Sequence, residues 1–116
     1  MDVSAVDIIV RPDGKVDVGS TVRLPGGQVR GQAVTMEAGN LPLFADRMEA
    51  FLAGRVSQEV DHVLGDDVIA FVYGGTDYQP VISIINLGPN RGTLWIGPEQ
   101  AAALPARIRD FVAHGR

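Results

Sequence analysis

The stretch "VIAFVYGGTDYQPVISIINL" at residues 68–87 decides the fold. It consists of two apolar runs, separated by a short segment that contains two glycines, an aspartate and a proline. Runs that are apolar at consecutive positions are typical of central strands, which have a helix over at least one face. Glycine supplies the positive φ of a tight turn, and aspartate hydrogen-bonds its own backbone there. We therefore predict that 68–72 and 81–85 are buried antiparallel strands joined by a hairpin.

The segment between these runs, from Gly74 to Tyr78, could also be a loop that holds a phosphate. Such loops bind phosphate because backbone N–H groups converge at the start of a helix. Here the segment leads into another strand, so the sequence indicates a hairpin loop without a phosphate site. Tyr78 at its tip is then an exposed aromatic residue, and such residues can anchor a protein partner.

Further strands are predicted before and after this hairpin. Apolar and polar residues alternate most clearly in "KVDVGSTVRL", and turns rich in glycine and proline separate the neighbouring segments. Short turns between the first three strands indicate an antiparallel meander. We expect Trp95, in the last strand, to pack under the C-terminal helix. The predicted strands outside the central pair are 5–10, 15–24, 29–38 and 93–97.

Two segments change to the spacing of a helix. Apolar residues recur three and four positions apart in 41–53 and in 98–113, which is the pattern of amphipathic helices. Asn40 is a suitable N-cap, Gly54 is a suitable residue after the C-cap, and Pro105 is expected to kink or split the second helix. The helical residues predicted to lie in the core are Phe44, Met48, Phe51, Leu52, Ile108 and Phe111.

The segment 55–64 fits two structures. Its valines could continue the first helix, while Val56, Val60 and Leu64 also share one face of a strand. We favour a strand, because a glycine ends the preceding helix and the "LGDD" that follows has the composition of a hairpin turn.

The order of these elements predicts one α+β domain over residues 1–116. Its sheet would be an antiparallel meander of about six to seven strands, and both helices would cover one face of that sheet. Apolar residues make up 46% of the chain, which is enough to form a core without disulfides or metals.

Composition and charge exclude several classes of site and of partner. The chain has no cysteine, which excludes disulfides, thiolate metal sites and a cysteine nucleophile. Its N-terminus lacks the pattern of a secretory signal, and no apolar run reaches the roughly 20 residues that span a bilayer. We therefore expect a cytoplasmic protein that does not act at a membrane. The net charge of −4 disfavours nucleic acid and suits a basic protein partner.

The sequence contains no pattern typical of a catalytic or metal site. His62 lies near Asp61, Asp66 and Asp67, but this spacing matches no zinc or calcium motif. On a strand, Asp61 and His62 would point to opposite faces, and we expect a solvated hairpin end. None of the serines lies in a G-x-S-x-G elbow. We therefore predict no catalytic residue, no metal and no cofactor.

The layout of the chain resembles small bacterial immunity proteins of the WapI type, which neutralise polymorphic toxins. The resemblance is carried by "LPLFADRMEAFLAG", "VIAFVYGGTDYQPVISI" and "TLWIGPEQAAALPARIRDF", together with Gly74, Gly75 and Asp77 between the central strands. It implies a protein that binds a basic toxin through an acidic surface and has no catalytic activity.

The sequence thus favours a non-catalytic protein-binding domain with an acidic surface. As the place where a partner binds, we slightly prefer the end of the sheet that carries 65–67 and 88–92 over the opposite end, which carries 74–79. Two alternatives stay open: a small-molecule-binding protein or small enzyme with a pocket between sheet and helices, and a homodimer that pairs sheet edges. The residues predicted to make contacts are Asp61, Asp66, Asp67, Asp77, Tyr78 and Arg91.

Overall fold

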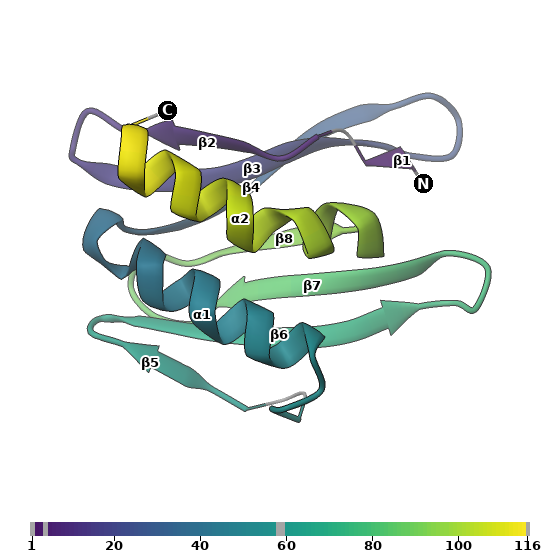
Figure 1. Cartoon of the computed structure of the whole chain (residues 1–116). Coiled ribbons are helices and arrows are strands. Elements are labelled where there is room, and N and C mark those ends of the chain that lie inside the picture. Colours follow the sequence, from purple (N-terminus) through teal and green to yellow (C-terminus); the bar gives the residue numbers. More distant parts are fainter. Residues whose placement is uncertain (1, 4, 58–59, 116) are drawn as a thin grey trace.

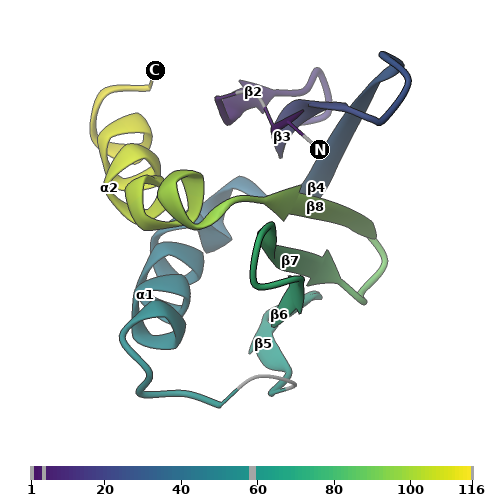
Figure 2. The same ribbon diagram turned by 90° about the vertical axis from the view of Figure 1, so that its right-hand side faces the viewer.

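The computed structural model describes residues 2–3, 5–57 and 60–115 and has two layers, a sheet and a pair of helices (Figure 1). Figure 2 shows both helices on the same side of the sheet. This confirms the predicted α+β class, with an antiparallel sheet and two helices. The helical elements are η1 (Ala38–Asn40), α1 (Leu41–Leu52) and α2 (Pro98–His114). The strands are β1 (Asp2–Val3), β2 (Asp7–Val10), β3 (Lys15–Arg23), β4 (Val29–Glu37), β5 (His62–Leu64), β6 (Asp67–Gly75), β7 (Pro80–Asn86) and β8 (Gly92–Ile96).

The strands follow the order β1-β3-β4-β8-β7-β6-β5, and all of their pairings are antiparallel. β2 follows β1 along the same edge of β3, so the eight strands fill seven positions in the sheet. The predicted central pair is confirmed as β6 and β7, which pair from Ile69↔Asn86 to Gly75↔Pro80. Only one face of this pair is fully buried, by Ile69, Phe71, Ile82 and Ile84.

The position of β8 is the feature of the sheet that the sequence did not predict. β8 lies between β4 and β7, so it joins the group formed by β1 to β4 to the group formed by β5 to β7. Its pairing with β4 is short and consists of Ala33↔Thr93 and Val34↔Gly92. Along the chain, α1 follows β4 and crosses the face of the sheet that the helices cover. β5 therefore begins at the far edge of the sheet and not beside β4 (Figure 1).

Beyond this short pairing, β4 and β8 diverge, and a side chain bridges the gap. The Gln32 amide donates from Nε2 to the carbonyl of Trp95 at 2.6 Å, and its Oε1 accepts from the Trp95 N–H at 2.8 Å. Nε2 also donates to Ser20 Oγ at 2.9 Å. The side chain of Gln32 therefore replaces the backbone ladder where the sheet opens, and Figure 2 shows the β3–β4 hairpin directed away from β6 and β7.

Gly92 is required where β8 meets β4. Its φ is +123°, and a Cβ at this position would lie 2.6 Å from the carbonyl oxygen of Ala33. We expect Gly92→Ala to lower the free energy of unfolding by about 2 kcal/mol, from backbone strain of this kind. Gly31→Ala is the matched control on the same sheet, because a Cβ there meets no atom within 4 Å. Urea denaturation measures both variants, and equal stability of the two would contradict the assigned strain.

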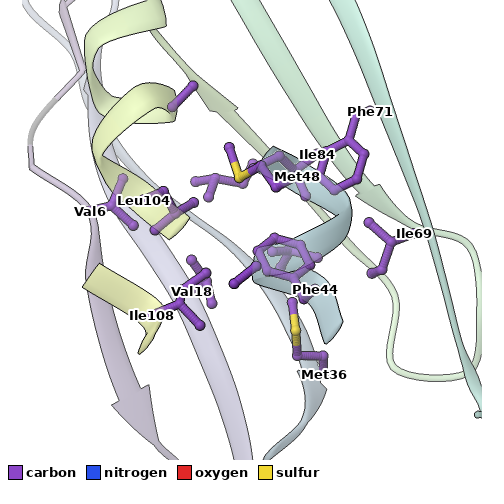
Figure 3. Close-up of a cluster of buried hydrophobic side chains, with 14 of the residues drawn as sticks. Val6, Val18, Met36, Phe44, Met48, Ile69, Phe71, Ile84, Leu104 and Ile108 are labelled. Atoms are coloured by element: carbon purple, nitrogen blue, oxygen red, sulfur yellow. The ribbon is translucent and has the colours of Figure 1, made fainter. Parts of the chain in front are cut away.

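The core lies between the sheet and the two helices (Figure 3). The predicted core residues Phe44, Met48, Phe51 and Ile108 are buried, as expected from the helical spacing. The other two, Leu52 and Phe111, are only partly buried and pack against the margin of the core. The face contributed by the sheet includes Val18, Met36, Ile69, Phe71 and Ile84.

Three local predictions need correction. Trp95 does not pack under α2: it is 46% exposed, because its neighbours Leu94 and Ile96 take the two positions that face the core. Of the kink or split expected at Pro105, the split is absent, since a single helix continues through this buried residue. Asn40 occupies the N-cap position of α1 but makes no capping hydrogen bond with its side chain.

The segment 55–64 contains a strand, as favoured, but only from His62 to Leu64. Residues 58 and 59 lie outside the described part of the chain. The expected end of α1 is confirmed, because Gly54 follows the C-cap with a φ of +73°. Among the described residues, no helix has the length and apolar character to cross a membrane.

Candidate functional site

Asp67, predicted to contact a partner, is completely buried at the start of β6. Its Oδ1 accepts hydrogen bonds from Asn86 Nδ2 at 3.0 Å and Asn90 Nδ2 at 2.7 Å. Its Oδ2 accepts from the Glu37 N–H at 2.9 Å and from Asn40 Nδ2 at 2.8 Å. The expectation that Asp67 lies at the surface is therefore wrong, because its carboxylate joins β4, η1, β6, β7 and the turn before β8.

The hydrogen bonds keep this buried carboxylate charged. Burial acts to raise the pKa of Asp67, but hydrogen bonds from Asn86, Asn40, Asn90 and the Glu37 N–H together hold that pKa below its ordinary value. Each of the three asparagine amides has a second acceptor, since Asn40 also donates to the Leu64 carbonyl, Asn86 to the Thr35 carbonyl and Asn90 to Glu37 Oε1. With four donors on two oxygens, the group stabilises the fold and is not open to a ligand.

The other predicted contact residues fall into separate places. Asp66 and Arg91 are exposed and lie at the same end of the sheet, where the backbone of Asp66 meets Gly88 in the turn before β8. Asp77 and Tyr78 lie in the hairpin at the opposite end, and Tyr78 is 95% exposed. Asp61 is exposed just before the edge strand β5. These residues belong to segments at opposite ends and at one edge of the sheet, so they do not form one compact surface.

His62 is buried, which corrects the expectation of a solvated hairpin end. It is 6% exposed, and its ring lies 5.4 Å from the ring of Phe71. Burial lowers the pKa of His62 first, and the charge of Arg47 lowers it further, while Asp61 acts weakly in the other direction. Its neighbour Asp61 is exposed and lies before the start of β5, whereas His62 is buried, so the two do not form a shared site.

The lowered pKa of His62 predicts a loss of stability in mild acid. The unfolded chain takes up a proton near the ordinary pKa of 6.5, and the folded chain does so only at lower pH. The stability contributed by neutral His62 is thus present above pH 6.5 and is lost as the pH falls below it. Urea denaturation across this window should show this loss in the native chain and a smaller one in His62→Gln. An unchanged loss in His62→Gln would contradict the assignment, and His114→Gln at the exposed end of α2 is the control.

The face of the sheet opposite the helices forms a continuous surface that was not predicted from the sequence. Cross-strand pairs such as Ser83↔Trp95 and Ile85↔Thr93 place these side chains on one side. All of them are at least partly exposed, with Val63 at 68% and Trp95 at 46%. We call this surface the open face and define it by Ala33, Val63, Val72, Val81, Ser83, Ile85, Thr93 and Trp95.

A groove continues the open face across β2, β3 and β4. Its volume is about 540 Å³, and Gly19, Gly31 and Ala33 form part of its floor. The register Asp7↔Gly19↔Ala33↔Thr93 places these residues on the same side of the sheet as the open face. Glycines leave the backbone uncovered there, so the groove exists because side chains are missing from two paired strands.

The open face and its groove differ in chemistry, because the lining of the groove includes the carboxylates of Asp7 and Asp17. The eight residues that define the open face are uncharged and are apolar or small. Within the described part of the chain, no group of three or more histidine, cysteine, aspartate or glutamate side chains is placed to hold a metal ion. Comparison of the sequence with models of known protein families gave no match, and comparison with curated proteins gave no significant match.

Proposed function

We propose that this chain is a non-catalytic protein-binding domain whose contact surface is the open face. The observation that carries the proposal is that the eight residues of the open face are uncharged and include a half-exposed tryptophan, Trp95, in a chain in which 21% of residues are charged; the carboxylates of Asp7 and Asp17 lie only in the adjoining groove. Uncovered apolar surface of this kind marks contact sites, and tryptophan is enriched among the residues that dominate binding energy.

The charge of the chain supports a protein partner over a nucleic acid. The net charge of −4 repels phosphate backbones, and it steers basic proteins toward the exposed carboxylates of Asp61, Asp66 and Asp77 around the sheet. We therefore also propose that a basic protein, such as the target of an immunity-like protein, contacts these carboxylates at the ends of the strands. A cytoplasmic location belongs to the same proposal.

The alternative of a pocket between sheet and helices has less support. Phe44, Met48 and Leu104 fill much of this space, and the hollow beside Val6 and Leu104 measures only about 130 Å³. Pockets for small organic ligands are typically about 300–1,000 Å³. The groove on the other side of the sheet reaches this size, but it is open and adjoins the open face.

Photo-crosslinking tests the proposed contact surface in cells that naturally contain the chain. A photoreactive residue in place of Ser83, beside Trp95 on the open face, should form covalent adducts with a protein. The matched control replaces Leu43, which is 40% exposed on α1. Adducts from position 83 that disappear on Trp95→Ala, with none from position 43, support the proposal. Equal labelling from both positions, or none from position 83, would overturn it.

A further inference from the structure

We propose that the open face binds a second copy of this chain, with Trp95 of each copy in the groove of the other. This inference rests on the proposed use of the open face as a contact surface. Two-fold dimers use the same surface on both subunits, so that surface must carry a projection and a matching hollow. The open face meets this requirement, because Trp95 on β8 lies one strand away from the groove that begins on β4 at Gly31 and Ala33.

The groove has the size and lining to receive an indole ring. Its volume of about 540 Å³ exceeds what one side chain needs, and Gly19 and Gly31 contribute no side chains to its lining. Ile9, which is 59% exposed, supplies an apolar wall. The half-buried carboxylate of Asp17 lies in the same lining and can accept a hydrogen bond from the indole N–H, which buried tryptophans need.

Charge also favours a second copy at this surface. Each copy carries −4, so surfaces rich in carboxylates repel one another when two copies meet. The residues that define the open face are uncharged, and they can meet their own copies without this repulsion. At the groove, the carboxylates of Asp7 and Asp17 lie 3.4 Å and 3.9 Å from Arg107 and Arg11 of the same chain, which reduces their local charge.

The sheet edges, through which the sequence suggested a homodimer, offer less contact. On one edge β5 has three residues, and on the other β1 and β2 have two and four. Short edge strands provide few unpaired backbone groups for a partner strand. The open face spans several strands of the sheet, so it offers more area than either edge.

Two substitutions separate the projection from the groove. Gly31→Gln should fill the groove without strain, since a Cβ at Gly31 meets no atom within 4 Å. Trp95→Ala removes the projection and leaves the groove open. Gly39→Gln is the matched control, because Gly39 lies in η1, away from the groove lining, and its Cβ position is equally free. Sedimentation equilibrium of the purified chain, over a wide concentration range, measures self-association.

We expect the native chain and Gly39→Gln to sediment at twice the chain mass of 12.4 kDa. Gly31→Gln and Trp95→Ala should each weaken self-association by roughly 30-fold or more, the effect of a typical tryptophan hot spot. A mixture of these two variants should associate again, because one chain still supplies Trp95 and the other still supplies the groove.

Three results would overturn the inference. These are a native chain that stays at 12.4 kDa at every concentration, a dimer that neither substitution weakens, and a mixture that fails to associate. If the native chain stays single while the photoreactive residue at position 83 labels a different protein, the second copy is wrong and the proposed function stands. If position 83 labels nothing as well, both are wrong.

Discussion

Replacement of Asp67 with asparagine is expected to lower the free energy of unfolding by about 4 kcal/mol, because two of the donors around this buried carboxylate lose their acceptor and the other two lose its charge. The carboxylate receives four hydrogen bonds, two on each oxygen, from Asn40, Asn86, Asn90 and the Glu37 N–H. In the variant, one oxygen becomes an NH₂ group that faces two donors. The side chain keeps its shape, so the effect isolates the hydrogen bonds from packing.

The control for this prediction is Asp66→Asn, one residue earlier and exposed, which should change stability by no more than about 0.5 kcal/mol. The pH dependence gives a second check. Because the pKa of Asp67 is lowered on folding, its contribution is present above the ordinary value of 3.8 and is lost as the pH falls through the lowered pKa. The difference between the native chain and Asp67→Asn should therefore shrink in strong acid. A difference in stability that stays constant with pH would contradict a charged carboxylate at Asp67.

Replacement of Phe51 with alanine is expected to cost about 3–5 kcal/mol, the usual loss for a fully buried phenylalanine. Phe51 is 2% exposed and connects α1 to the sheet through two aromatic contacts. Its ring lies 5.3 Å from the ring of Phe71 and 4.7 Å from that of Tyr73, stacked on both. Its removal leaves a cavity and also uncovers Tyr73, which is already 53% exposed.

Phe111→Ala provides the comparison, since Phe111 lies at the margin of the core on α2 and is only partly buried. Its loss should be clearly smaller than that of Phe51→Ala in the same urea titration. A loss below about 1 kcal/mol for Phe51→Ala, the average effect of a point substitution, would show that α1 does not pack on β6 as described.

The sequence predicted the elements that depend on local periodicity. Helical spacing located Phe44, Met48 and Phe51 in the core, and the two apolar runs located β6 and β7. The position of β8 could not be predicted in this way, because pairing with β4 depends on a close approach at Gly92 that only the folded sheet imposes.

The candidate site was predicted less well. Asp67 was assigned to the surface because a turn rich in aspartate is normally solvated, and its three asparagine partners come from distant segments. Alternation did contain a signal for Trp95, since Leu94 and Ile96 share the opposite face of the strand. A second signal was the apolar residues on both faces of β6 and β7. Because both helices cover the same side of the sheet, the apolar residues on the other side remain uncovered and form the open face.

Acrylamide quenching of the fluorescence of Trp95 tests the contact surface most directly, because the chain contains a single tryptophan. In the isolated chain, the 46% exposed ring should be readily quenched. When light scattering on the same samples shows that the chain has associated, with a second copy or another protein, quenching should fall and the emission should shift to shorter wavelength. A tryptophan that is quenched equally in the isolated and the associated state would contradict the open face as the contact surface.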